Sequence, residues 1–328
     1  ATAAVGQTVP VWVAVGGRMA RDDVAAHGAV LLKTAPLLYR DLHASLNRTL
    51  NTTASPGHRC YPHSANLGIY QGCNFRSYSE MFFSAALTAE QTDAMYLQGL
   101  GVTSCEGGRF LTVGSPSGGS SGAALIFVHI PQGLPFGLLV HDMVERFLLY
   151  AFTQSAHSAT RGTWTTPESQ HIDRDAGGWP YASPGAANVP MALKWMLCFE
   201  EPETRTLWLA KATPRGWLAA GEAPIVAANL TTRYGRVSYT ITPPAATEGG
   251  NYTVRANVTL PPSFAASPPD GGVRLRLRVP SGRLSSVSVG GASWAAFSAA
   301  EETVDVPAAK LTAALLRDGL PRIVATFA

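Results

Sequence analysis

We predict the fold from the stretch Leu134 to Asp175, LPFGLLVHDMVERFLLYAFTQSAHSATRGTWTTPESQHIDRD. Its first half repeats apolar residues every three or four positions, which predicts an apolar helix from about Leu138 to Phe152. Its second half reads as a polar loop, and it carries these side chains able to ionise or stack: Arg161, Trp164, Glu168, His171 and Asp173. Because only 14% of the chain is charged, this loop is the first place to look for chemistry.

The composition is that of a globular protein. At 328 residues, with 46% hydrophobic content, the chain suits about two domains with sizeable cores. The formal net charge is only +3 and no basic run occurs, so nucleic acid is not an expected partner. No apolar run reaches the roughly 18 residues of a membrane span. The first residues lack the order of a signal peptide, so either a secretion signal has been removed or the chain is one piece of a longer protein.

Sequons indicate the compartment. Five Asn-x-Ser/Thr triplets, each in or beside a polar loop or a strand edge, are candidates for N-linked glycosylation, namely Asn47, Asn51, Asn229, Asn251 and Asn257. More sequons occur than a chain of ordinary composition holds by chance. We therefore expect an extracellular or secreted glycoprotein.

The four cysteines fit an oxidising compartment. Cys60 and Cys73 flank a loop rich in Gly, Asn and His, which predicts a local disulfide between them. Cys105 is an alternative partner for either residue. Cys198 lies in an apolar segment that we predict to be helical, so we expect a buried thiol there.

Zinc is the alternative use of the same cysteines. His58 and His63 lie near Cys60, and imidazole and thiolate are the ligands that zinc prefers. The spacing does not match that of paired CxxC sites. We expect no metal and no cofactor.

The periodicity of the chain changes about two thirds of the way along. Before that point the pattern is helical, with Pro36 predicting a kink or break in the first long helix and Thr88 with Gln91 predicting a capping box. From about Ile225 the period becomes two, and these strands are expected: 236–241, 252–260, 273–279, 285–289 and 322–327. We predict a helical domain over 1–203 and a strand domain over 204–328.

One predicted strand carries a row of arginines. The segment VRLRLRV places Arg274, Arg276 and Arg278 on one face and aliphatic residues on the other. We expect the arginines to form the solvated face of a sheet, and a ligand site is the alternative.

Four segments together resemble a known family. The junction LKWMLCFEEPETRTLWLAKATPRGWLAAGEAPIVAANLTTRYGRVSYTI and the upstream segments RSYSEMFFSAALTAEQ, HDMVERFLLYAFTQSAH and TRGTWTTPE are similar to parts of six-hairpin glycosidases, which are (α/α)6-barrel glycoside hydrolases with a C-terminal β-sandwich. A full barrel needs about 350 residues, and only about 200 precede the strands here. The resemblance therefore implies a partial (α/α)6 barrel of helical hairpins followed by an antiparallel β-sandwich. It also implies carbohydrate as a partner, with other protein subunits completing the barrel.

Glycoside cleavage requires two carboxyl groups, one as acid and one as base or nucleophile. Glu168 is the first candidate, because Trp164 could stack on a sugar and raise the pKa of the carboxyl group. Asp142 and Asp173 are candidates for the second carboxylate, and Glu80 is a weaker one. An ordinary structural role is the alternative for each, such as pairing of Glu168 with Arg161.

Other side chains are candidates for substrate binding. They share the ability to stack on a sugar ring or to bind its hydroxyl groups, and they are Trp164, His141, His171, Arg161 and Trp179. For His141 and Asp142 the alternative is that they bridge neighbouring helices.

Two functions stay open at this point. The chain is either an extracellular, glycoside hydrolase-like protein that acts on or binds polysaccharide or glycoprotein glycans, or a structural or sugar-binding glycoprotein without turnover. The resemblance favours the first function, and the missing half of the barrel favours the second.

Overall fold

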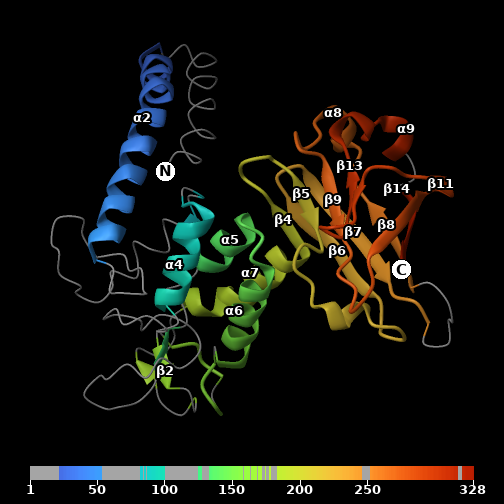
Figure 1. Cartoon of the computed structure of the whole chain (residues 1–328), viewed down its shortest axis with the longest axis horizontal. Coiled ribbons are helices and arrows are strands. Elements are labelled where there is room, and N and C mark those ends of the chain that lie inside the picture. Colours follow the sequence, from blue (N-terminus) through green and yellow to red (C-terminus); the bar gives the residue numbers. More distant parts are fainter. Residues whose placement is uncertain are drawn as a thin grey trace. The chain divides into compact units, whose positions relative to one another are not determined.

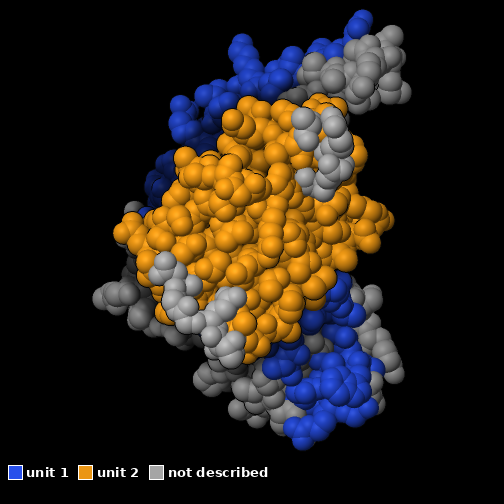
Figure 2. Space-filling model, turned by 90° about the vertical axis from the view of Figure 1, so that its right-hand side faces the viewer, with its two compact units in different colours: residues 1–191 blue, residues 192–328 orange. Residues whose placement is uncertain are grey.

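The computed structural model divides into two compact units, residues 1–191 and 192–328 (Figure 2). It describes residues 22–53, 82–83, 85, 87–99, 125–127, 133–157, 159–162, 164–167, 169–171, 174, 177–178, 183–245, 252–316 and 320–328. In those ranges no helix combines the length and hydrophobicity that a membrane span requires.

The first unit is mainly helical (Figure 1). Its helices are α2 (Asp22–Thr53), α4 (Ala89–Gly99), α5 (Gly133–Val140), α6 (Val144–His157) and α7 (Ser183–Leu197), and the division between the units falls inside α7. A small antiparallel sheet joins β1 (Leu125–Phe127), β2 (Ser169–His171) and β3 (Gly177–Gly178).

Helix α2 contains Pro36 without being broken into two helices. Of the two outcomes expected at this proline, the break is therefore wrong, and the kink stays a prediction. Proline removes one backbone donor and therefore one hydrogen bond of the helix. The other 31 residues of the 32-residue helix keep their helical backbone. Two residues before Pro36, the Thr34 hydroxyl donates to the Val30 carbonyl at 2.9 Å, a bond from the side chain to the helix backbone.

The capping box at the start of α4 is confirmed. The Thr88 backbone N–H donates to Gln91 Oε1 at 2.9 Å, and the Gln91 backbone N–H donates to Thr88 Oγ1 at 3.2 Å. Each side chain satisfies a backbone donor that the first turn of a helix leaves open. The helix therefore begins where the sequence predicts.

The single helix expected over 138–152 is instead two helices, α5 and α6. At the end of α5, Met143 N–H donates to Leu138 O at 2.8 Å and Asp142 N–H donates to Leu139 O at 3.2 Å. These two bonds form a Schellman motif, which needs a left-handed residue at Asp142, and its φ is 56°. No glycine or proline marks this position, so the apolar periodicity concealed the break.

The second unit contains two larger sheets. The six-stranded sheet is antiparallel throughout, in the order β11 (Ala292–Ser293), β10 (Leu284–Val289), β14 (Leu320–Phe327), β8 (Tyr252–Thr259), β7 (Gly235–Thr242) and β6 (Ile225–Thr232). The five-stranded sheet has the order β12 (Phe297–Ser298), β13 (Thr303–Val306), β9 (Val273–Arg276), β5 (Leu207–Leu209) and β4 (Cys198–Glu200). In this sheet β5 pairs with β9 in parallel, and the other pairs are antiparallel.

Short helical segments connect the strands of this unit. They are η1 (Arg215–Leu218), α8 (Ser263–Ala266), η2 (Ala308–Lys310) and α9 (Ala313–Leu316). Pro214 precedes η1, and Gly221 after it has a φ of 84°. The proline sets the start of this 3-10 helix and the left-handed glycine follows its end.

One hydrophobic core lies between the strands of the second unit. Alternate residues of β7, namely Val237, Tyr239 and Ile241, are buried, as are Val254, Ala256 and Val258 of β8, and aliphatic residues of β5, β9 and β13 belong to the same cluster. The predicted period of two is therefore the period of burial. The expectation of helices together with antiparallel sheets is confirmed at this level.

Two expectations in this unit are corrected. Cys198 is buried and free, as expected, but it is the first residue of β4 and not part of a helix. Arg276 and Arg278 are only 7% and 4% exposed, so the arginine row is not a solvated face. The guanidinium groups donate to backbone carbonyls, Arg276 Nε to Glu301 O at 2.9 Å and Arg278 Nη1 to Thr213 O at 2.9 Å. Those bonds compensate for the loss of water.

Candidate functional site

Ala159 to Gly162, with Trp164 and Thr165, form a tight turn. Thr160 N–H donates to Thr165 O at 2.8 Å, the two threonine hydroxyls lie 2.8 Å apart, and Trp164 N–H donates to Thr160 O at 3.1 Å. Trp164 has a φ of 55°, an unfavourable value for a bulky residue. The hydrogen bonds between the threonines hold the backbone in this conformation.

Trp164 extends from this turn into solvent. Its side chain is 73% exposed. Arg174 lies with its Cζ 5.2 Å from the centre of the indole ring, and its Nε donates to Ala159 O at 2.7 Å. The Arg161 N–H donates in turn to Arg174 O at 2.9 Å. Arg174 therefore contacts the turn and lies against one face of the ring.

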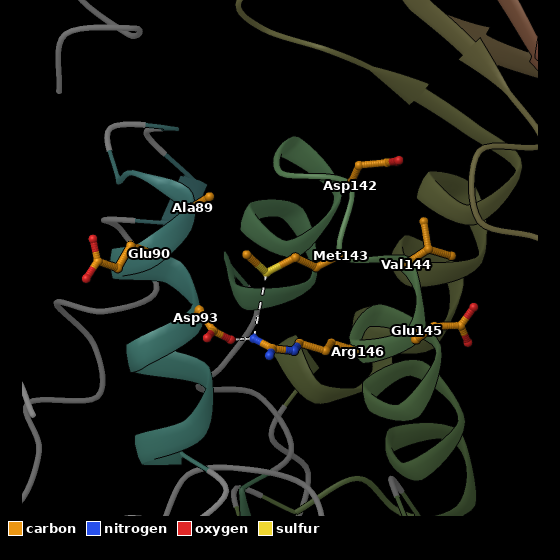
Figure 3. A pocket seen from close by; sticks show the side chains of 8 residues that line it. All are labelled: Ala89, Glu90, Asp93, Asp142, Met143, Val144, Glu145 and Arg146. Atoms are coloured by element: carbon orange, nitrogen blue, oxygen red, sulfur yellow. Dashed lines mark hydrogen bonds and ion pairs between the residues drawn. The ribbon is translucent and has the colours of Figure 1, made fainter. Parts of the chain in front are cut away.

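A pocket of about 500 Å³ lies at the junction of α5 and α6, beside α4 (Figure 3). Its lining combines acidic, basic and apolar side chains: Ala89, Glu90, Asp93, Asp142, Met143, Val144, Glu145 and Arg146. Four carboxylates and one guanidinium give the pocket a negative formal charge. Such a charge favours ligands with a positive charge or many hydroxyl donors.

Arg146 organises the inner side of the pocket. Its Nη1 forms an ion pair with Asp93 and lies 3.9 Å from the sulfur of Met143. Its Cζ lies 5.1 Å from the centre of the Tyr96 ring. The arginine therefore joins α4 to α6, and the partly buried Tyr96 hydroxyl has a raised pKa because of its burial.

His141 and Asp142 occupy the Schellman turn and differ in their surroundings. His141 is half-buried, and its Nε2 lies 2.8 Å from Leu87 O; since a carbonyl only accepts, this nitrogen carries the proton. Asp142 is exposed and lines the pocket. His141 thus bridges two segments of the chain, whereas Asp142 lies at the surface of the pocket.

Several predicted residues lie outside the described part of the chain. They are the catalytic candidates Glu168, Asp173 and Glu80, the binding candidate Trp179, the cysteines Cys60, Cys73 and Cys105, the histidines His58 and His63, and the sequon residue Asn251. For His171 the backbone is described as part of β2, and for Asn51 as part of α2, without their side chains. The roles expected for all these residues stay predictions.

The structure assembles the pocket from residues that sequence reasoning missed. Glu90 and Asp93 come from α4, and Glu145 and Arg146 come from α6. A signal was present, since Glu145 and Arg146 lie three and four residues after Asp142. The contribution of α4, some 50 residues earlier in the chain, depends on tertiary packing that periodicity does not reveal.

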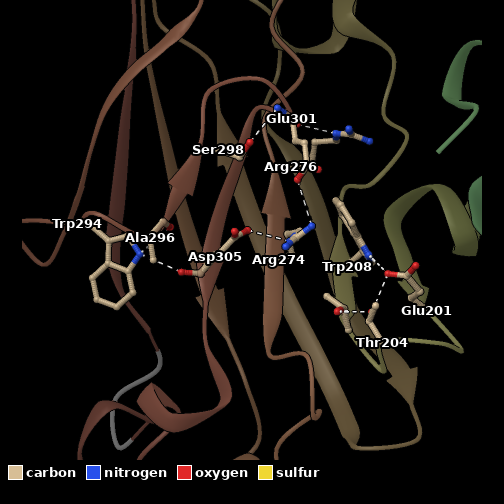
Figure 4. A network of polar contacts seen from close by, with 11 residues as sticks. Glu201, Thr204, Trp208, Arg274, Arg276, Trp294, Ala296, Ser298, Glu301 and Asp305 are labelled. Carbon is tan, nitrogen blue, oxygen red and sulfur yellow. Dashed lines mark hydrogen bonds and ion pairs between the residues drawn. The ribbon is translucent and has the colours of Figure 1, made fainter. Parts of the chain in front are cut away.

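A second tryptophan surrounded by cations lies in the second unit (Figure 4). Trp208 on β5 is 4% exposed. Its ring centre lies 3.7 Å from Lys211 Nζ, 4.8 Å from Arg274 Cζ and 5.4 Å from Arg276 Cζ. Its Nε1 donates to Glu201 Oε2 at 3.0 Å. Every polar feature of this ring is used within the protein, so we assign the cluster a structural role.

The described residues contain no group of three or more His, Cys, Asp or Glu side chains that could hold a metal ion. The pocket carboxylates therefore do not converge as ligands. Comparison of the chain with protein-family models, with curated proteins and with solved structures finds no match.

Proposed function

We propose that this chain is an extracellular carbohydrate-binding protein, related in fold to six-hairpin glycosidases, in which Trp164 stacks on a sugar ring. The observation that carries the proposal is the exposure of the indole on a hydrogen-bonded turn. An exposed indole offers a flat apolar surface to the C–H groups of a sugar, and its N–H can bind a hydroxyl group. The turn fixes this surface before any ligand arrives, which lowers the entropic cost of binding.

Arg174 supports the same role. A guanidinium over one face of an indole is attracted to the electrons of the ring. That contact limits rotation of the ring and leaves the opposite face for a ligand. Arg161 lies on the same turn and is exposed, so its donors are within the region that a bound saccharide would cover.

Binding to immobilised glycans tests the proposal. The full chain is screened on an array of polysaccharides and glycoprotein glycans, and the strongest ligand is then titrated by calorimetry. Trp164→Ala is expected to weaken binding at least tenfold, or about 1.4 kcal/mol. Trp217→Ala is the matched control, because Trp217 is also exposed but lies in the second unit. Equal affinity of Trp164→Ala and the unchanged chain would exclude Trp164 as the platform.

Glycoside hydrolysis is the second candidate function, and the carboxylate-lined pocket favours it. In this version Glu168 is the acid, and Asp142 or Asp173 is the second carboxylate, at the separation of roughly 5 to 9.5 Å that glycosidases use. The exposure of Asp142 in the pocket supports its part in such a pair.

A hydrolysis assay separates the two functions. If the chain cleaves its ligand, Glu168→Gln and Asp142→Asn are each expected to reduce turnover at least a hundredfold while binding persists. Glu203→Gln is the control, because Glu203 is an exposed carboxylate in a turn of the second unit. If the chain binds the glycan but releases no sugar from it, the result supports the binding function and excludes hydrolysis.

We also propose the detailed architecture of the two units, a partial (α/α)6 barrel followed by a β-sandwich. Two sheets that share one core support a β-sandwich, and the paired helices α5 and α6 support a partial (α/α)6 barrel. We further propose that helical hairpins of another polypeptide complete the barrel. Helix α2 has an apolar surface for them, with Val30, Leu37 and Leu38 each more than half exposed.

The size of the particle in solution tests this partner. Light scattering after gel filtration is expected to show an assembly larger than one chain when the hairpin-bearing partner is present. Leu38→Glu is expected to disrupt it, because a charge on an apolar interface is costly. Assembly of Leu38→Glu as readily as of the unchanged chain would exclude α2 as the contact.

A further inference from the structure

Two sequon asparagines lie on the outer face of the six-stranded sheet. Asn257 is exposed on β8, between the buried residues Ala256 and Val258. Thr259, the third residue of the sequon, is also exposed. Since successive side chains of a strand point to opposite faces, the asparagine and the threonine share the solvent face while the valine packs in the core.

Asn229 lies on β6, where the pairing with β7 shifts between Ala227 and Leu230. The residue is exposed with a φ of 54°, a conformation that asparagine tolerates better than most residues. Its backbone N–H donates to Ser238 Oγ at 2.9 Å. The backbone is thus anchored to β7, and Thr231, which completes the sequon, is exposed as well.

The two asparagines are close to each other. Ser238 on β7 is opposite Thr259 on β8, and Thr240 is opposite both Asn257 and, on β6, Val226. With strands about 4.8 Å apart, Asn229 and Asn257 are separated by on the order of 10 Å across the sheet. Val226, which is 66% exposed, lies on the same strand as Asn229 and is in register, across Thr240, with Asn257.

Asn47 differs from both of these residues. It lies within helix α2, and its Oδ1 accepts a hydrogen bond from Gln91 Nε2 at 2.9 Å. A glycan on this asparagine would have to be accommodated next to α4. Asn47 is exposed as well, but its side chain is hydrogen-bonded to α4, whereas Asn229 and Asn257 lie on the solvent face of a sheet, where a folded protein tolerates the bulk of a glycan.

We propose that Asn229 and Asn257 both carry N-linked glycans and that these cover the outer face of β6, β7 and β8. In the modification, the side-chain amide nitrogen bonds to the anomeric carbon of a lipid-linked oligosaccharide. The bond between that carbon and the phosphate oxygen of the lipid breaks, and the amide gives up one proton as the lipid pyrophosphate leaves. The proposal is independent of sugar binding at Trp164, which lies in the other unit.

Mass spectrometry of the secreted protein tests the two sites. The full chain is secreted from a eukaryotic host and treated with a peptide N-glycosidase, which converts each glycosylated asparagine to aspartate. Aspartate is expected at 229 and at 257 after treatment and at neither position before it. Unmodified asparagine at either position in the treated wild-type protein would overturn the proposal.

Sequon variants provide the controls. Thr231→Ala and Thr259→Ala are each expected to lose one glycan, whereas Thr231→Ser and Thr259→Ser keep the sequon and both glycans. If an alanine variant fails to fold, mass spectrometry of the wild-type protein and of the serine variants still shows whether Asn229 and Asn257 carry glycans. Glycosylation at Asn47 with neither strand site occupied would overturn the proposal.

Discussion

Trp164 and Trp208 are both contacted by arginine, yet they have opposite surroundings. Trp208 is 4% exposed on strand β5, and its ring lies near Lys211, Arg274 and Arg276. Trp164 is 73% exposed on a turn, and Arg174 lies over its ring. The same pair of residue types thus stabilises a sheet in one unit and presents a free aromatic face in the other. The element that carries each tryptophan thus decides whether its ring is enclosed by the protein or accessible to solvent.

The largest expected effect comes from removing the buried ring. Trp208→Ala is expected to lower the free energy of unfolding by about 3 to 5 kcal/mol, through lost burial and a cavity. Trp164→Ala is expected to change it by less than about 0.5 kcal/mol. Urea unfolding of both variants, followed by circular dichroism, measures the contrast. Equal destabilisation by the two substitutions would contradict the difference in burial between Trp208 and Trp164.

Alkaline pH is expected to weaken the hydrophobic core of the second unit, which contains Cys198 and Tyr239. Burial raises the pKa of the Cys198 thiol from 9.0 to about 12 and also raises the pKa of the Tyr239 hydroxyl. Above pH 9 the unfolded thiol loses its proton while the folded one keeps it, so stability falls as pH rises, by up to ~1.4 kcal/mol per pH unit from this group. Below pH 9 the thiol contributes no pH dependence.

Unfolding midpoints between pH 8 and pH 11 test this expectation. Cys198→Ala is the control, and its stability should fall less steeply with pH than that of the unchanged chain. Identical slopes would mean that the thiol is not buried in the folded state.

Removing one cation from the buried cluster is expected to have a smaller effect. Arg276→Met keeps an unbranched side chain but loses the bonds to Glu301 O and Lys211 O. We expect a loss of about 2 kcal/mol in the free energy of unfolding. Arg236→Met is the control, because Arg236 is an exposed arginine of β7. Similar losses in the two variants would show that the buried hydrogen bonds of Arg276 do not contribute to the free energy of unfolding.

The smallest expected effect concerns the exposed pair. Arg174→Met leaves Trp164 in place and removes the cation over its ring. Contacts of this kind at exposed sites contribute about 0.5 to 1 kcal/mol, so sugar affinity is expected to fall about threefold. Calorimetric titration of the variant, with the glycan that binds the unchanged chain, measures this loss of affinity. An affinity loss as large as that of Trp164→Ala would indicate that Arg174 contacts the sugar directly.

The strands were predictable because apolar and polar residues alternate along the sequence with the same period of two as burial does in the structure. Val237, Tyr239 and Ile241 alternate with half-buried polar residues, and the pattern needs no knowledge of neighbouring elements. The short strands β11 and β12 have only two residues each, too few to show a period. Cys198 was assigned to a helix because α7 passes directly into β4 without a breaking residue.

The candidate site was predictable only in part. The exposure of Trp164 agrees with the loop expected around it, and Asp142 lines a pocket. The left-handed turn at Asp142 could not be foreseen, because aspartate has no strong preference for it over a helix. The pairing of Arg146 with Asp93 joins helices that are distant in sequence, and a single sequence does not specify which helices meet. Burial of Arg276 was missed because alternation predicts which face a residue occupies and not what covers that face.

The pairing of β4 with β5 limits how the protein can be cut. Strands β4 and β5 lie at one end of the five-stranded sheet, more than 60 residues before the next strand of that sheet. A fragment that begins at residue 204 keeps β5 but loses β4, which leaves the backbone of β5 as an open edge. Open edges pair with other chains and lead to aggregation. A soluble fragment of this half therefore has to begin upstream of Cys198.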